Sequence, residues 1–173
     1  MRLPFVLVLL GGFAGCAELT EFSCAHTDPV ARGERLARQG QPESALAREV
    51  ARCAATPTPL SAELLAEGYA RGRAIHCTPA GAFDAGHDGY RLGDFCPEAA
   101  VPELERANRR GFLLREVEAE IRSLRHERFA LVAQLRGLDA DDPDYTSRRS
   151  RLWRLDWRLN QLDQRRFLLR AAY

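Results

Sequence analysis

The sequence predicts an all-α protein: a small, disulfide-stabilised helical domain with a glycine-rich loop, followed by a long, coiled-coil-like antiparallel helical hairpin. Three observations support this class. Apolar residues recur at spacings of three and four along two long stretches of the C-terminal half. Proline-containing breaks separate shorter candidate helices in the N-terminal half. Four cysteines follow the leader segment, and an even number is typical of disulfides that stabilise a small core.

The first 16 residues, MRLPFVLVLLGGFAGC, are typical of a secretory signal peptide. Arg2 precedes an apolar run that is too short to span a bilayer permanently. The end of the segment, FAGC, resembles the lipobox of bacterial lipoproteins, in which the cysteine is acylated and becomes the first residue. The resemblance implies that Cys16 carries a lipid anchor, and Ala17 after it favours the periplasmic face of the outer membrane. The alternative is an ordinary secretory signal that is cleaved elsewhere.

Composition is consistent with a small exported domain. After removal of residues 1–15, 158 residues remain, which is enough for one modest core. Without Arg2 the chain has 24 basic and 24 acidic residues, so its net charge is near zero. This balance argues against nucleic acid as the main partner. Every basic residue is Arg, which we attribute to coding composition rather than to function.

Three shorter helices are predicted in the N-terminal half, at residues 29–39, 43–55 and 61–75. The break TPTP at 56–59 separates the last two, and Ser61 is a suitable N-cap for the third. Leu64, Gly68 and Gly72 fall four apart on that helix. Because glycine costs about 1 kcal/mol in a helix relative to alanine, we expect close backbone packing there by segment 77–96 or the helix after it. A ligand groove over the glycines is the alternative.

The four cysteines after the leader predict two disulfides in an oxidising compartment. Four cysteines allow three connectivities. We expect Cys24–Cys53 and Cys77–Cys96, because each of these pairs closes a local segment.

The segment HCTPAGAFDAGHDGYRLGDFCP at 76–97 contains the side chains best suited to metal binding or catalysis. A zinc site would use His76, Cys77, His87 and Cys96, but the short paired spacing of structural zinc motifs is absent. A calcium loop at 84–95 fails at its third and twelfth positions, which are Gly86 and Phe95. Catalysis by a histidine with an aspartate lacks an evident nucleophile. We therefore expect no catalytic residue, metal or cofactor, with His76, His87, Asp84 and Asp88 as the residues of the alternative.

The C-terminal half predicts two long helices that pair with each other. The polar segment GLDADDPDYTS at 137–147 predicts a turn, because Gly137 can end a helix and Pro143 resists its continuation. Residues 103–145 carry a net charge of −2 and residues 146–173 carry +6, which favours antiparallel pairing. The apolar stripes comprise Val117, Ile121, Leu124, Leu131, Leu135 and Leu138 in the first helix, and Leu152, Leu155, Leu159, Leu162 and Leu169 in the second.

The arginine excess on the second arm of the hairpin suggests a binding surface. Arg and Trp together favour contacts with proteins, with anionic lipid headgroups or with another acidic polymer. A stalk with a solvated charged face is the plainer interpretation. Unsatisfied heptad positions would also allow homo-oligomers through the hairpin. The predicted binding residues are Arg151, Arg154, Arg158, Trp153 and Trp157.

A longer pattern resembles a known family. Gly68-x₃-Gly72-Arg73-x₃-Cys77-Thr78-Pro79 is followed by Phe83, Gly86, Gly89, Tyr90 and Cys96-Pro97, and then by Ala107 and Gly111. This spacing resembles the uncharacterised bacterial lipoproteins called domain of unknown function 2799, over residues 24–115. The family's usual aromatic residues are replaced here by Pro29, His76, Leu104 and Asn108. The resemblance implies a lipoprotein with a disulfide-bearing loop, and it implies no activity.

We therefore expect a signal peptide at 1–15, a helical domain at 16–101 and a helical hairpin at 102–173. The expected function is that of a non-catalytic cell-envelope lipoprotein that binds a partner or acts as a scaffold. Its expected partners are an envelope protein or an anionic lipid, besides the membrane that holds its anchor. The alternative is a periplasmic enzyme, or a binder of a small ligand or metal, that uses the His and Asp residues of segment 76–96.

Overall fold

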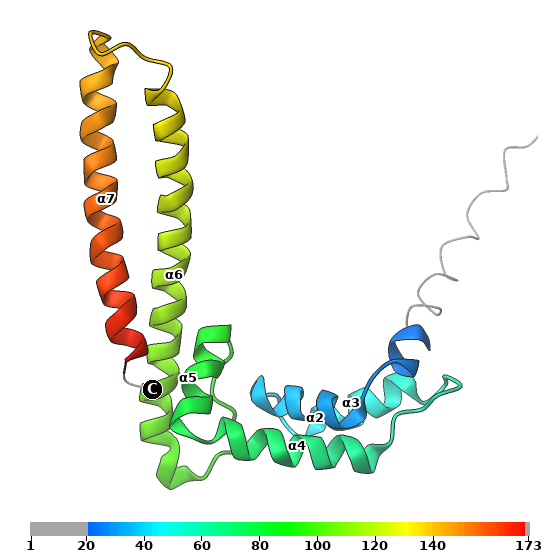
Figure 1. The fold of residues 1–173 in the computed structure, drawn as a ribbon. Coiled ribbons are helices and arrows are strands. Elements are labelled where there is room, and N and C mark those ends of the chain that lie inside the picture. The colour runs from blue at the N-terminus through cyan, green and yellow to red at the C-terminus, as the bar shows by residue number, and fades with distance from the viewer. Residues whose placement is uncertain (1–20, 172–173) are drawn as a thin grey trace, which may run out of the picture. The chain divides into compact units, whose positions relative to one another are not determined.

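The computed structural model describes residues 21–171 and confirms the predicted all-α class (Figure 1). A helical segment at 21–25 precedes the named helices. Within residues 21–171, no helix has both the length and the apolar character needed to cross a bilayer. The signal peptide and Cys16 lie outside the described residues. The helices are α2 (Pro29–Arg38), α3 (Ser44–Cys53), α4 (Ala62–His76), α5 (Pro79–Asp88), the 3₁₀ helix η1 (Glu98–Ala100), α6 (Val101–Leu135) and α7 (Pro143–Arg170).

The described chain forms two compact units. The first unit contains the described residues up to His76 together with Gly93–Cys96, and the second contains Cys77–Leu92 together with Pro97 and the residues after it. The sequence-based boundary between residues 101 and 102 does not coincide with this division. The reason is that α5 packs on α6 and therefore belongs with the hairpin.

In the first unit, α2 and α4 pack backbone against backbone. A Cβ atom on Gly68 would overlap the backbone of Val30, and one on Gly72 would overlap the backbone of Glu34. Gly33 on α2 makes the reciprocal approach to the backbone of α4. Asp28 caps α2 by accepting hydrogen bonds from two backbone N–H groups, and Pro29 occupies its first turn. The cost of glycine in these helices is offset by their close contact.

The helix that packs on Gly68 and Gly72 differs from the one predicted from the sequence. We expected segment 77–96 or the following helix to cover Gly68 and Gly72, whereas α2 covers both. The close approach was predicted correctly, but its partner was not. Because α2 occupies this face of α4, the space that a ligand groove over the glycines would need is filled. Leu64, which has the same four-residue spacing, is exposed.

The side-chain core of the first unit lies around α2, α3 and α4. Leu36, Ala37, Ala45 and Tyr69 form one buried cluster, against which Phe95 packs. A second buried cluster, at the start of the unit, comprises Cys24, Cys53 and Leu60. The Cys24–Cys53 disulfide predicted from locality is present there, and Cys77 and Cys96 are each disulfide-bonded as well.

The expected glycine-rich loop is in fact largely helical. Residues Pro79–Asp88 form α5, and the Thr78 hydroxyl caps it by accepting a hydrogen bond from the Gly81 N–H at 3.0 Å. Gly89 ends the helix in the left-handed region, with φ of 94°. Thr-Pro at the start and Gly at the end are ordinary helix boundaries. The prediction of a loop was wrong because these boundaries enclose a capped helix whose Gly86 packs against the backbone of α6.

These glycines serve packing in the second unit. A Cβ atom on Gly111 of α6 would overlap the backbone of α5, and one on Gly86 of α5 would overlap the backbone of α6. Beside this contact, the buried Asn108 amide donates hydrogen bonds to the carbonyl oxygens of Ala82 and Tyr90, at 2.9 and 3.0 Å. Each unit is therefore built around one helix pair in which small residues bring two backbones together.

Helices α6 and α7 form the predicted antiparallel hairpin (Figure 1). Val117, Ile121, Leu159 and Leu162 form its buried cluster, with Leu124 and Leu169 packed against it. The observed turn lies between Leu135 and Pro143, so it overlaps the predicted segment 137–147 only in part. Residues 143–147 of that segment belong to α7, because Pro143 begins this helix instead of resisting it. Ion pairs tie the two arms together: Arg128–Asp156, Glu127–Arg151, Glu120–Arg158, Glu118–Arg170 and Arg125–Asp163.

Candidate functional site

His76 is a structural group in the first unit. Its side chain is 1% exposed, and the Gly93 N–H donates to its Nε2 at 3.0 Å. Nδ1 therefore carries the proton and donates to the Arg38 carbonyl oxygen, also at 3.0 Å. Burial lowers the pKa of His76, and the hydrogen bond to the Arg38 carbonyl offsets only part of that effect. The imidazole is thus neutral, and each of its ring nitrogens is hydrogen-bonded to a backbone group.

His87, Asp84 and Asp88, the other residues of the alternative enzyme or ligand site, do not form a catalytic arrangement either. His87 Nε2 lies 2.9 Å from a carboxylate oxygen of Glu118 on α6. Burial alone would raise the pKa of Glu118, but the contacts with His87 and Arg170 together lower it. Asp84 and Asp88 are exposed on α5. These contacts hold α5 and α7 on α6, and they do not assemble a nucleophile with a base.

The zinc alternative fails on the chemistry of its donors. Cys77 and Cys96 are both oxidised in disulfides, so neither offers the thiolate that zinc requires. The ring nitrogens of His76 are already bonded. Among residues 21–171, no group of three or more His, Cys, Asp or Glu side chains is placed to hold a metal ion.

The buried imidazole predicts a pH-dependent stability. Because the folded protein lowers the pKa of His76, the unfolded chain, with a pKa near 6.5, binds more protons just below that pH. Stability should therefore rise with pH between about 5 and 7, and fall as the medium is acidified. Glu49 and Glu118, whose pKa values are lowered, act below about pH 4.5, outside this window. Urea unfolding at the two ends of the window measures the effect.

The matched variant is His76→Gln. A glutamine side chain has one acceptor and one donor group for the same two backbone partners, but it does not titrate. The variant should unfold at nearly the same urea concentration at both ends of the window. If the wild type and the variant change equally with pH, another group causes the dependence.

The most distinctive surface of the described chain is the side of α7 that faces away from α6. Trp153, Trp157, Phe167 and Leu168 are 70%, 55%, 70% and 64% exposed. In projection all four lie in the half of the helix opposite its buried residues. We call this surface the α7 outer face; it comprises these four residues, the amides Asn160 and Gln164, and Arg149, Arg154 and Arg165.

Only part of the predicted arginine set is available for binding. Arg151 and Arg158, both predicted as binding residues, form ion pairs with Glu127 and Glu120 across the hairpin. Arg154 is exposed and has no ion pair or hydrogen bond among the described residues, and the same holds for Arg149 and Arg165. The three acids of α7 are all in ion pairs with arginines: Asp144 with Arg148, Asp156 with Arg128, and Asp163 with Arg125 and Arg166.

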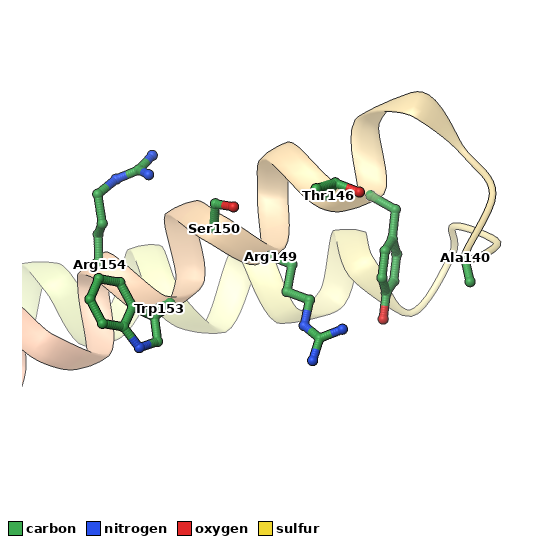
Figure 2. A pocket seen from close by; sticks show the side chains of 7 residues that line it. Ala140, Thr146, Arg149, Ser150, Trp153 and Arg154 are labelled. Atoms are coloured by element: carbon green, nitrogen blue, oxygen red, sulfur yellow. The ribbon is translucent and has the colours of Figure 1, made fainter.

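Two open pockets lie along this surface. Figure 2 shows the first, at the start of α7, where Trp153 lies beside Arg154 and Arg149 extends from the same helix. None of the residues that line it is acidic. The second pocket is lined by Asn160, Asp163, Gln164, Phe167 and Leu168.

The five predicted binding residues do not include Arg149, Arg165, Phe167 and Leu168, although the first three belong to the arginine-rich arm that the sequence already indicates as a binding surface. A helical projection places Arg149, Phe167 and Leu168 within the half of α7 that lies opposite Leu155, Leu159 and Leu162, and it places Arg165 at the border of that half. The same projection moves Arg151 and Arg158 toward the arm that they pair with. Separating the two sides of α7 was therefore possible from the sequence.

Comparison with known proteins finds a family match for one part of the chain. Residues 29–113 match the model of the family described as Protein of unknown function (DUF2799). The match begins at the first residue of α2 and ends in α6, so it includes both glycine contacts and leaves out most of the hairpin. No curated protein and no solved structure matches the chain significantly.

Proposed function

We propose that this chain, which carries a DUF2799 domain of unknown function, is a lipid-anchored cell-envelope protein that binds an acidic protein partner through the α7 outer face. It is non-catalytic, and Cys16 anchors it at the periplasmic face of the outer membrane. Its signal peptide ends in a lipobox-like sequence, and its disulfides suit an oxidising compartment. In this proposal the anchor precedes the DUF2799 domain in the chain, and α7 provides the binding surface.

The observation that carries the proposal is the α7 outer face itself. Two tryptophans, a phenylalanine and a leucine are more than half exposed on one side of one helix. Trp and Arg are the residue types that most often dominate the energy of protein interfaces. The three arginines among them have no ion-pair partner in the described chain, so an acidic surface would complement them.

A protein fits this surface better than a membrane does. Asn160 and Gln164 separate the pair Trp153 and Trp157 from Phe167 and Leu168. An amide that enters the acyl region without a hydrogen-bond partner costs free energy, whereas a protein can offer that partner. A second copy of the chain is also disfavoured. A symmetric contact of two outer faces would bring unpaired arginines against one another.

Site-specific photo-crosslinking in cells tests the proposal. A crosslinker at position 157 should give one product larger than the protein, and Arg149→Gln, Arg154→Gln and Arg165→Gln together should remove it. Position 129 is the control, because Phe129 is 77% exposed on α6. The matched charge control replaces Arg106, Arg122 and Arg136 of the same hairpin. Mass spectrometry of the crosslinked product identifies the partner and also shows whether the chain begins at an acylated Cys16.

Other results would contradict the proposal in distinct ways. A product of twice the chain's mass would indicate self-association. Crosslinks to lipid alone would indicate a membrane-binding face. Equal products from positions 157 and 129 would mean that the α7 outer face is not selective.

A further inference from the structure

The first unit contains a polar pocket that the proposed function does not use. Its volume is about 420 Å³, within the range of roughly 300–1,000 Å³ that is usual for small-ligand sites. Segment 23–28, α2 and α3 all contribute to its wall. We call it the arginine pocket; it is lined by Ser23, His26, Thr27, Asp28, Ala31, Arg32, Arg35 and Arg52.

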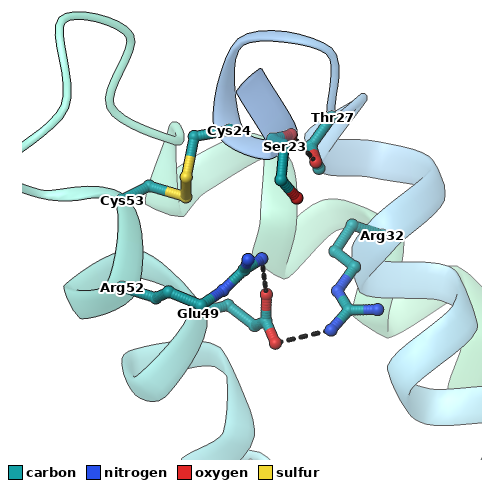
Figure 3. A network of polar contacts seen from close by, with 7 residues as sticks. All are labelled: Ser23, Cys24, Thr27, Arg32, Glu49, Arg52 and Cys53. Atoms are coloured by element: carbon teal, nitrogen blue, oxygen red, sulfur yellow. Dashed lines mark hydrogen bonds and ion pairs between the residues drawn. A yellow bond between two sulfur atoms is a disulfide. The ribbon is translucent and has the colours of Figure 1, made fainter. Parts of the chain in front are cut away.

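Glu49 fixes two of these guanidinium groups. Figure 3 shows its carboxylate between Arg32 and Arg52. The ion pairs with these two residues measure 2.6 and 2.8 Å. The hydrogen bond from Arg32 is the largest influence on the pKa of Glu49, and with Arg52 it lowers that pKa despite burial. The carboxylate is therefore ionised at neutral pH, and it holds two arginines from different helices close together.

The pocket retains positive charge after this pairing. Arg32, Arg35 and Arg52 carry three positive charges, against the two negative charges of Asp28 and Glu49. A carboxylate oxygen of Asp28 is already used as an acceptor for two backbone N–H groups at the start of α2. Arg35 is exposed and has no ion pair among the described residues. The excess charge favours an anionic ligand.

The donors that line the pocket come from three different segments of the first unit. Arg35 lies one helical turn after Arg32 on α2, Arg52 comes from α3, and the Ser23 hydroxyl comes from the segment before α2. The buried Nε of Arg32 has no hydrogen-bond partner. A planar carboxylate is satisfied by one guanidinium fork, whereas a tetrahedral phosphate accepts hydrogen bonds from several directions.

From this geometry we propose that the arginine pocket binds a phosphate group. A soluble phosphate ester and a phospholipid headgroup offer the same chemistry. The headgroup source rests on the proposed anchor, because Ser23 is only seven positions from Cys16 and seven residues span at most about 25 Å. The soluble source does not depend on the anchor.

Calorimetric titration of the full protein, purified in a neutral detergent, tests the site. One arm uses inorganic phosphate, and the other adds short-chain phosphatidic acid to the micelles. Arg35→Gln is the test variant, because this arginine can be replaced without breaking the Glu49 ion pairs. Arg38→Gln is the matched control, since Arg38 lies on the same helix outside the pocket and pairs with Glu34.

We expect saturable binding in at least one arm, weakened roughly tenfold or more by Arg35→Gln and unchanged by Arg38→Gln. Binding of inorganic phosphate would identify a soluble ligand, and binding of the lipid alone would identify a headgroup. Saturable binding in neither arm, or equal loss in both variants, would overturn the proposal. Thermal unfolding of Arg35→Gln should match that of the wild type. The result is independent of the α7 outer face, so the two proposals can fail separately.

Discussion

Replacement of Gly68 by leucine should destabilise the first unit by about 3 kcal/mol or more, which is a large fraction of the stability of an ordinary domain. A Cβ atom at this position would overlap the backbone of Val30, which cannot move aside as a flexible side chain can. Helices α2 and α4 would have to separate, which would open the core around Leu36 and Tyr69. Urea unfolding followed by circular dichroism measures the loss.

Gly137→Ala is the matched control for this variant. Gly137 lies in the turn between α6 and α7, and the nearest atom to an added Cβ would be the Gln134 carbonyl oxygen, at an ordinary 3.7 Å. Its φ is not positive, so alanine is not strained there. We expect a change within about 0.5 kcal/mol. If Gly68→Leu were equally mild, the two backbones would not be in contact.

Removal of the Cys24–Cys53 disulfide should cost roughly 3–4 kcal/mol on the chain-entropy account. The bond closes a loop with a sequence separation of 29 and lies in a buried cluster with Leu60. It also joins the residue beside Ser23 to the residue beside Arg52, so it holds two walls of the arginine pocket together (Figure 3). The double variant Cys24→Ala and Cys53→Ala, unfolded in urea without reductant, gives the value.

Reductant provides the control for the disulfide prediction. Reduction of the wild type should lower stability more than reduction of the double variant, which keeps only the bonds of Cys77 and Cys96. The double variant should also bind phosphate less tightly, because segment 23–28 would no longer be fixed to α3. A double variant as stable as the wild type would mean that packing around α2 and α4 holds the segment without the bond.

The hairpin was predictable because its information is local. Apolar residues at spacings of three and four place Val117, Ile121, Leu159 and Leu162 on two facing stripes, whatever the rest of the chain does. The same periodicity determines which residues of α7 face outward. The tryptophans of the candidate binding face were therefore identified from the sequence, while two of the three predicted arginines proved to pair across the hairpin.

The sequence by itself determined the helical class and the hairpin, and it favoured the pairing of Cys24 with Cys53 and close packing at Gly68 and Gly72. Only the tertiary structure decided that α2 covers those glycines, that the 77–96 segment is mostly helix, and that His76 is a neutral buried group. The physical reason is the range of the interactions. Periodicity and capping act within a few residues, whereas the choice of packing partner depends on which distant backbones can approach one another most closely.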